Sequence, residues 1–277
     1  MKFKIFVHPL RPKVQAGKIQ KILQSLDLQI SEIDPDIALV IGGDGTFSHY
    51  GRKLSIPMLF IGVPTDEILG SKSRLAETSL QNLTKTLRNI AKGNYVVSEK
   101  RMLDVRYGAS PVISVLTDIY LERGLFAGCI RYSISITSKK IDKKNKNNSK
   151  PIFRDYVIGN GVIISTSFGS TGYYSYLDRI KNPKQKPSEL FDDNKLGLCH
   201  ILPTFATRLM SDGVNYKKII PIRYTVPVSS TIDITVIREA NIRLYGTTIH
   251  SKGVKISWNN PITVTSSSKT AKIIRLV

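Results

Sequence analysis

The chain has 277 residues, enough for two hydrophobic cores, because single cores rarely grow beyond about 250–300 residues. With 41% apolar and 22% charged residues, its composition is that of a globular protein and excludes a wholly disordered chain. Only Cys129 and Cys199 are present, which excludes a disulfide framework, and no apolar run reaches the about 18 residues of a membrane span. We therefore expect a cytoplasmic protein with no membrane segment.

The balance of charge is strongly basic. Lysine and arginine total 41 against 21 acidic residues, a net charge of +20 that favours polyanionic partners such as nucleic acid, a membrane surface or phosphorylated small molecules. Six of the lysines lie in Ser138–Lys150 and three in Lys181–Pro187. Neither stretch contains the aromatic residues that stack on bases, so we interpret both as solvated loops and do not expect a nucleic-acid partner.

The first hundred residues alternate short apolar runs with helical patterns. The patterns predict strands at Lys4–Val7, Ile37–Ile41 and Pro57–Val63, a helix carrying Ile19, Ile22, Leu23 and Leu26 on one face, and a second helix carrying Leu80, Leu83, Leu87 and Ile90 that ends at Gly93. The continuous apolar run Ile37–Ile41 is typical of a strand buried on both faces. Strand–helix alternation of this kind predicts a parallel sheet layered with helices.

After Asn94 the sequence becomes rich in valine, isoleucine, tyrosine and serine, which favour strands. Strands are predicted through residues 95–140 and at Val157–Thr166, Thr231–Arg238, Ile242–Tyr245, Val254–Ile256 and Ile262–Thr265, with one short helix in Gly169–Ile180. We therefore expect an α/β + β fold. Residues 1–97 form a Rossmann-like three-layer α/β domain, and residues 98–277 form a mainly antiparallel β-rich domain whose C-terminal tail is a candidate to return to the first domain.

The motif with the clearest chemistry is Gly42-Gly43-Asp44-Gly45-Thr46, between a buried strand and a helical pattern. Glycines let a backbone approach a phosphate closely, and the amides of a following helix N-terminus complete an anion site. Asp44 could accept a proton from an attacking hydroxyl or hold the metal bound to ATP. The plainer alternative is a strand-to-helix turn in which Asp44 is the helix N-cap. The spacing matches neither the GxGxxG fingerprint nor the P-loop.

At these residues the chain resembles the NAD kinase family, and more distantly the diacylglycerol and sphingosine kinases. A second match runs from Gly159 to Tyr173, where NAD kinases carry Gly-Asp-Gly, a strand, Ser-Thr-Pro and then Thr-Gly-Ser-Thr-Ala-Tyr. A third is Leu116-Thr117-Asp118, in the place of the family's Leu-Asn-Glu. Together the matches span roughly residues 36–175.

The resemblance implies transfer of the γ-phosphoryl group of ATP to the adenosine-ribose 2′-hydroxyl of NAD, with Mg²⁺ or another divalent metal accompanying ATP and substrate held between the two domains. It assigns activation of the hydroxyl to Asp44. It further implies that the chain forms a homodimer or homotetramer, with NAD and ATP as its ligands. Phosphate binding falls to Gly42, Gly43, Gly45, Thr46, Gly169 and Ser170, and adenosine binding to Thr117, Asp118, Asn160, Thr171, Gly172, Tyr173 and Tyr176.

The chain departs from the family mainly where the family recognises the nucleoside. Thr117 and Asp118 replace Asn and Glu, and Asn160 replaces an acid. Phe168 stands where Thr or Ser is usual, and the family's Asn-containing segment is reduced to Gly62–Gly70. These changes leave open a kinase of the same superfamily acting on a lipid, sugar or nucleoside hydroxyl, and polyphosphate as donor. A non-catalytic nucleotide- or nucleic-acid-binding protein is supported only by the charge of +20.

Overall fold

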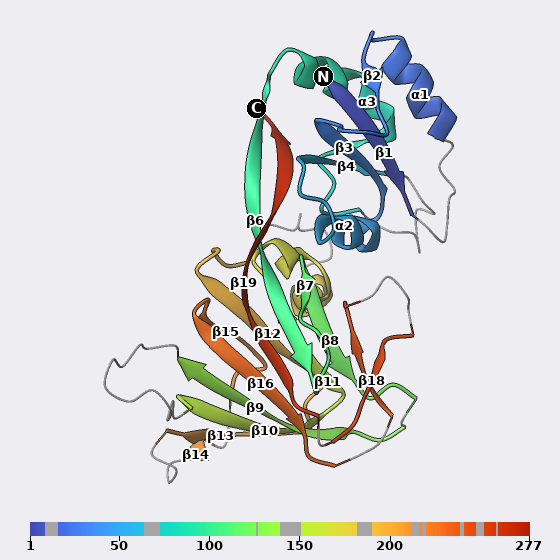
Figure 1. The fold of residues 1–277 in the computed structure, drawn as a ribbon. Helices are drawn as coiled ribbons and strands as arrows, with labels where there is room; N and C mark the ends of the chain where they lie inside the picture. The colour runs from blue at the N-terminus through green and yellow to red at the C-terminus, as the bar shows by residue number, and fades with distance from the viewer. Residues whose placement is uncertain are drawn as a thin grey trace. The chain divides into compact units, whose positions relative to one another are not determined.

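The computed structural model of the chain describes residues 1–8, 16–63, 73–125, 127–138, 151–181, 190–211, 216–217, 220–238, 241–247, 252–258 and 260–277. The lysine-rich stretches 139–150 and 182–187 and most of the segment Gly62–Gly70 lie outside these residues. The chain divides into two compact units (Figure 1): unit 1 is residues 1–100 with 270–277, and unit 2 is residues 101–269. Within the described ranges, no helix is both long and apolar enough to span a bilayer.

Unit 1 is built from a parallel sheet and its helices. Its elements in chain order are β1 (Lys2–Val7), α1 (Ala16–Gln24), β2 (Gln29–Ile30), β3 (Ile37–Gly42), α2 (Asp44–Gly51), β4 (Met58–Gly62), β5 (Thr78–Ser79), the 3-10 turn η1 (Leu80–Asn82), α3 (Leu83–Ala91) and the start of β6 (Tyr95–Tyr107). The central strands run parallel in the order β4-β3-β1-β2. The strands and helices predicted for this region are confirmed.

Helices cover both faces of this sheet. Ile19 of α1 and Leu87 of α3 share one buried cluster with Leu39 of β3, so α1 and α3 lie on the same face. On the opposite face Phe47 of α2 stacks on Phe60 of β4, with ring centroids 4.6 Å apart and planes 6° from parallel. Residues next to each other on a strand point to opposite faces, which is why β3 and β4 are apolar throughout. The predicted three-layer α/β arrangement is confirmed.

The long strand β19 (Ile262–Leu276) contributes to both units. Near its start Val264 pairs with Ile232, and near its end Ile273 pairs in parallel with Met58 of β4. The sequence predicted only Ile262–Thr265, because the serine-rich middle of the strand has no apolar alternation. The last residues therefore belong to the sheet of unit 1.

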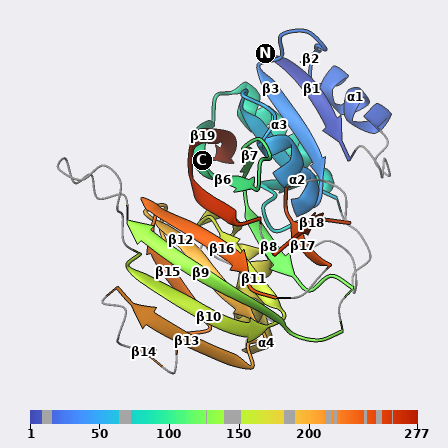
Figure 2. The same cartoon turned by 60° about the horizontal axis from the view of Figure 1, so that its bottom comes forward.

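Unit 2 contains two facing sheets joined by short connections. Its further elements are β7 (Ile113–Val115), β8 (Asp118–Glu122), β9 (Ile130–Ser138), β10 (Phe153–Gly159), β11 (Gly161–Ser165), η2 (Phe168–Thr171), η3 (Tyr173–Ser175), α4 (Tyr176–Lys181), β12 (Lys195–Ile201), β13 (Phe205–Met210), β14 (Tyr216–Lys217), β15 (Arg223–Pro227), β16 (Ser230–Val236), β17 (Ile242–Tyr245) and β18 (Val254–Ile256). One sheet has the order β14-β13-β10-β9-β16-β19, and the other has the order β15-β12-β11-β8-β17-β18 (Figure 2). The pairings within these two sets of strands are antiparallel, as predicted.

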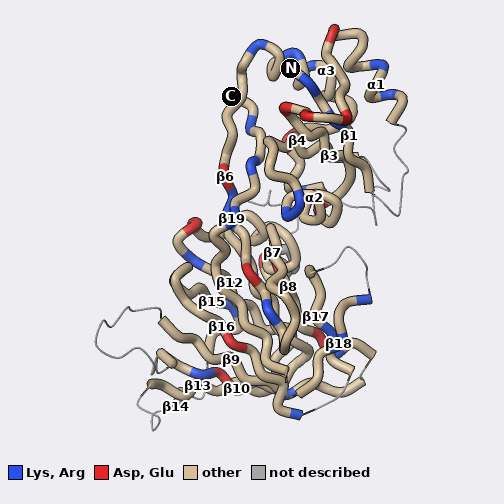
Figure 3. Tube along the Cα trace, viewed as in Figure 1, with Lys and Arg blue, Asp and Glu red and all other residues tan. Residues whose placement is uncertain are grey.

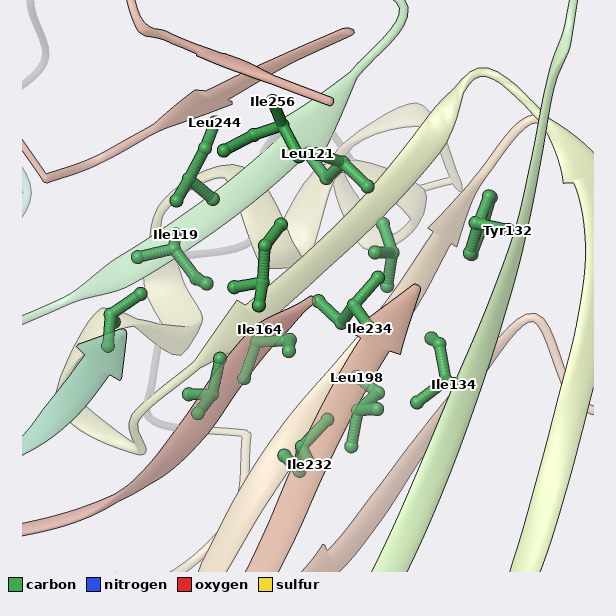
Figure 4. Packing of buried hydrophobic residues seen from close by; sticks show 14 of the residues in the cluster. Ile119, Leu121, Tyr132, Ile134, Ile164, Leu198, Ile232, Ile234, Leu244 and Ile256 are labelled. Atoms are coloured by element: carbon green, nitrogen blue, oxygen red, sulfur yellow. The ribbon is translucent and has the colours of Figure 1, made fainter. Parts of the chain in front are cut away.

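The core of unit 2 lies between these sheets (Figure 4). Ile134 and Ile232 of the first sheet and Ile164 and Leu198 of the second belong to one cluster of fully or almost fully buried side chains. The predicted strand Val157–Thr166 is divided in two at Asn160, so that β10 belongs to the first sheet and β11 to the second. Strands β12 and β13 were not predicted, although β12 is almost entirely buried.

A polar network crosses this apolar core. Asp155 of β10 is fully buried and accepts hydrogen bonds from Arg208 Nε (2.6 Å) and Nη2 (2.8 Å) and from the hydroxyl of Tyr224 (2.6 Å). Burial alone would raise the pKa of Asp155, but Arg208, His200 and Tyr224 hold it below its ordinary value. Since Tyr224 and His200 come from the second sheet, this carboxylate ties the two sheets together.

We expect Arg208→Ala to lower the free energy of unfolding by about 3–5 kcal/mol, because it leaves a buried carboxylate without its cation. Urea denaturation followed by circular dichroism would measure the loss. Lys195→Ala is the control, since its ion pair with Asp192 is exposed and is worth at most about 1 kcal/mol. Equal losses in the two variants would contradict the role given to the network.

Candidate functional site

In unit 1 the glycine-rich loop begins at the last residue of β3. Gly42 has φ +155°, a region that favours glycine, and an added Cβ would lie 2.6 Å from Thr46 Oγ1. Thr46 is buried at 3% exposure and its amide donates to the carbonyl of Gly43 at 2.9 Å. Thus the loop doubles back on itself tightly at Gly42, and no other residue fits there without displacing Thr46.

The start of α2 presents backbone amides for an anion. Gly43 is the N-cap residue, in an extended conformation with no side-chain capping bond. The amides of Asp44 and Gly45 donate to no acceptor within the described part of the chain. Gly45 is exposed, and a Cβ placed there would meet nothing within 4 Å. A helix N-terminus with free amides and a positive dipole end suits a phosphate.

Asp44 is the first residue of α2, so the alternative in which it is the N-cap is wrong. Its carboxylate is partly exposed, and Oδ1 accepts a hydrogen bond from the backbone amide of Leu75 at 3.0 Å. A carboxylate beside amides that would hold phosphate repels that phosphate unless it accepts a proton or binds a cation. The position therefore suits a proton acceptor or a ligand of the metal that accompanies a nucleotide.

In unit 2 the second match forms a tight turn against Thr117, which lies in the bend between β7 and β8. An added Cβ at Gly169 would lie 2.3 Å from the carbonyl oxygen of Thr117, so backbone meets backbone at this point. Thr166 fixes the turn, because its hydroxyl lies 2.9 Å from the carbonyl of Leu116 and 3.0 Å from that of Thr117, and accepts from the amide of Gly169 at 3.0 Å. The structure thus brings Thr117 and Gly169 together.

Asp118 lies between two further glycines. Its Oδ2 would be 3.7 Å from a Cβ on Gly172, and its carbonyl oxygen would be 2.3 Å from a Cβ on Gly246. Gly246 has φ +91° and follows β17, which pairs with β8. The backbones of Gly172 and Gly246 therefore both lie close to Asp118.

Aromatic side chains continue the same face of β8. Tyr120 stacks on Tyr245, with centroids 5.0 Å apart, and meets the edge of Tyr173 at 5.2 Å. The Tyr173 hydroxyl donates to Glu122 Oε1 at 2.9 Å. The ring centroids of Tyr173 and Tyr176 lie 5.9 Å apart. Burial, followed by the carboxylates of Asp118 and Glu122, raises the pKa of Tyr120 to about 12.

Three residues predicted to bind the nucleotide are either buried or distant from Asp118. Ser170 is fully buried, and its hydroxyl donates to the carbonyl of Ser167 and accepts from the amide of Leu190. Thr171 is 7% exposed, and its carbonyl accepts from the Ser175 hydroxyl. Asn160 stands just before β11, whereas Asp118 pairs with the last residue of that strand, so the two lie about 14–17 Å apart along it.

Sequence reasoning missed Tyr120, Glu122, Tyr245, Gly246 and Thr166. Alternation along β8 could have found the first two, since Asp118, Tyr120 and Glu122 point to one face of the strand. Tyr245 and Gly246 carry no local signal, because they reach Asp118 only through the pairing of β17 with β8.

No cluster of three or more metal-binding side chains occurs in the described ranges. Mg²⁺ that arrives with a nucleotide needs only one or two protein carboxylates besides phosphate and water. Asp44 fits that requirement, and it is the carboxylate of the glycine-rich loop.

The curated proteins whose sequences are similar to this chain include NAD kinases. The chain is 30% identical to the NAD kinase of Carboxydothermus hydrogenoformans over 158 residues, 53% of this chain and 50% of that kinase. It is 34% identical to the NAD kinase of Sulfurisphaera tokodaii over 107 residues, 38% of this chain and 40% of that kinase. The chain therefore spans about half or less of the length of these curated relatives. No protein-family model matches it.

Solved structures extend the likeness to the whole chain. An NAD kinase from Archaeoglobus fulgidus in complex with ATP superimposes with a TM-score of 0.63 at 16% identity, covering 100% of this chain and 94% of that one. The chain has the fold of an NAD kinase. Yeast NADH kinase complexed with NADH agrees, with a TM-score of 0.65 at 15% identity over 100% of this chain and 83% of that one. The resemblance to NAD kinases expected from the sequence is confirmed.

We expect Gly169→Ala to lower the free energy of unfolding by about 1–3 kcal/mol, because its methyl group would overlap the Thr117 carbonyl. Chemical denaturation would measure this loss. Gly17→Ala in α1 is the matched control, since its methyl group enters open space and an alanine stabilises a helix by about 0.5–1 kcal/mol. A Gly169→Ala variant as stable as the wild type would contradict the close backbone contact.

Proposed function

We propose that the chain is an ATP-dependent NAD kinase, which transfers the γ-phosphoryl group of ATP to the 2′-hydroxyl of the NAD adenosine ribose and forms NADP. The observation that carries the proposal is Asp44, a partly exposed carboxylate at the first position of a helix whose leading amides are free. The likeness to NAD kinases in sequence and in fold supports the same reaction. Polyphosphate is the alternative donor.

The phosphate-binding part of the proposal rests on the loop Gly42–Thr46. The amides of Asp44 and Gly45 would donate to the phosphate chain, and the exposed Gly45 admits it without a side chain in the way. Phosphoryl transfer depends on this kind of positioning and charge stabilisation more than on covalent chemistry. The net charge of +20, with basic residues visible on both units in Figure 3, favours anionic substrates.

In the proposed step, the 2′-oxygen forms a bond to the γ-phosphorus while the bond from that phosphorus to the bridging oxygen breaks. ADP leaves with the electron pair of the broken bond, and the hydroxyl proton passes to the carboxylate of Asp44. Mg²⁺ enters with ATP as part of the substrate and neutralises phosphate charge. The hydrogen bond from Leu75 holds Oδ1 of Asp44, and Oδ2 would accept the proton.

Recognition of the nucleoside is proposed for the face of β8. Asp118, between the bare backbones of Gly172 and Gly246, would accept hydrogen bonds from a ribose hydroxyl or an exocyclic amine. Tyr173 would offer its ring to the base, since its hydroxyl is already bound to Glu122. The expected homodimer or homotetramer and the cytoplasmic location stay predictions.

The proposal is tested by incubating the protein with ATP, Mg²⁺ and a panel of hydroxyl compounds that includes NAD, and by identifying products with mass spectrometry. NADP as the main product would support the assignment. If only another acceptor is phosphorylated, that compound would replace NAD as the proposed substrate, and the assignment as a kinase would stand. The altered residues Thr117 and Asp118 are the reason for testing acceptors broadly.

Asp44→Asn should reduce kcat at least about 100-fold, because an amide accepts no proton from the attacking hydroxyl. The melting temperature should change little, since the amide oxygen still accepts from Leu75. Steady-state assays with saturating ATP and NAD, alongside thermal unfolding, would measure both. A near-normal kcat would remove Asp44 from the mechanism.

Thr117→Asn combined with Asp118→Glu should lower KM for NAD roughly five- to thirty-fold, at about 1–2 kcal/mol for regained hydrogen bonds. An Asn amide pairs with a base edge through both a donor and an acceptor, whereas Thr offers one hydroxyl. The kcat should change little, because neither substitution touches the glycine loop. Weaker use of NAD, with good use of another acceptor by the wild type, would show a site shaped for that acceptor.

A further inference from the structure

The carboxylate of Asp44 is oriented by the irregular segment Ser73–Glu77, which lies beside β4. Among the described residues, one hydrogen bond restrains this carboxylate: the amide of Leu75 donates to Oδ1 at 3.0 Å. Leu75 belongs to no helix or strand, so the position of its amide depends on what fixes the segment Ser73–Glu77.

The near end of the segment is fixed on the glycine loop. The Ser73 hydroxyl donates to the carbonyl of Gly42 at 3.1 Å, and the amide of Ala76 donates to the carbonyl of Ser73 at 3.0 Å. An added Cβ on Gly62 would lie 3.0 Å from Cβ of Ser73, so the segment lies directly against β4. Leu75 itself is 6% exposed.

The far end of the segment is fixed by Glu77. Its amide donates to the carbonyl of Phe60 at 2.9 Å. Its side chain is 16% exposed and uses both carboxylate oxygens: Oε1 accepts from the amide of Leu276 at 2.9 Å, and Oε2 accepts from Arg275 Nη1 at 2.7 Å. The two partners lie at the end of β19, where the strand runs beside β4.

We propose that Glu77 is a positioning residue for phosphoryl transfer: by joining the end of β19 to the segment 73–77, it holds the Leu75 amide that orients the Asp44 carboxylate. This inference rests on the proposed function, because it concerns the orientation of the proton acceptor. Misplacing a catalytic group by about 1 Å can cost about 100-fold in rate, so a residue two positions from the contact can govern the rate without touching substrate.

Glu77→Ala should lower kcat at least about ten-fold and leave KM for ATP and NAD within about two-fold, because the phosphate- and nucleoside-binding groups stay in place. Glu77→Gln should recover most of the rate, since its amide oxygen still accepts from Leu276. The matched control is Glu32→Ala, which removes a 76% exposed carboxylate from the ion pair with Lys4 in the same unit and should leave kcat unchanged.

A double-mutant cycle separates this role from general weakening of unit 1. Once Asp44→Asn has removed the proton acceptor, adding Glu77→Ala should reduce the residual rate no further. A further ten-fold loss in that background, or an equal loss in Glu77→Gln and Glu77→Ala, would overturn the inference. If Glu77→Ala fails to fold, Arg275→Ala replaces it in the cycle, because it removes one of the two bonds to Glu77 and leaves the other.

The proposed function fails separately from this inference. A wild-type protein that forms no phosphorylated product, or an Asp44→Asn variant with normal kcat, would overturn the proposed function. If Asp44→Asn is strongly impaired and Glu77→Ala lowers its residual rate further, the proposed kinase activity would stand. Only the positioning role of Glu77 would be overturned.

Discussion

The turn from β3 into α2 leaves no room for a side chain at Gly42, and the other features of unit 1 depend on that restriction. With a Cβ there, Thr46 would have to move, and the first turn of α2 would move with it. The amides of that turn, the carboxylate of Asp44 and the Ser73 hydroxyl on the Gly42 carbonyl all take their positions from this one backbone conformation. A buried parallel strand that ends in glycine therefore positions the groups that we propose for phosphate binding in unit 1.

Glycines also allow close backbone contacts in unit 2. The backbone of Gly169 lies against that of Thr117, and Gly246 lies against Asp118, so glycine again allows close approach beside residues proposed to recognise the nucleoside. Behind this face, the buried carboxylate of Asp155 joins strands of both sheets through Arg208 and Tyr224. Beneath the face, one buried apolar cluster is shared by both sheets, and β17 pairs directly with β8.

The glycine loop and most elements of unit 1 could be predicted because their signals are local. Ile37–Ile41 followed by three glycines and an aspartate specifies a buried strand, a turn and a helix within about ten residues. The surroundings of Asp118 could not be predicted to the same extent. Tyr245 and Gly246 reach it only through strand pairing across more than a hundred residues, and such pairing leaves no periodic signal at either position. The contact between Leu75 and Asp44 is hidden for the same reason, since it joins an irregular segment to a helix.

Strand β19 has a consequence for how the protein is made. Residues 270–277 complete the sheet of unit 1 beside β4, yet the ribosome synthesises them after the whole of unit 2. Until they emerge, the edge of β4 near Met58 lacks this neighbour, and both oxygens of Glu77 lack the partners that they have in the folded protein. An unpaired strand edge can pair with another chain, which makes this edge of β4 a site of risk until β19 is in place. The sheet of unit 1 therefore receives this strand only after the strands of unit 2 have been synthesised.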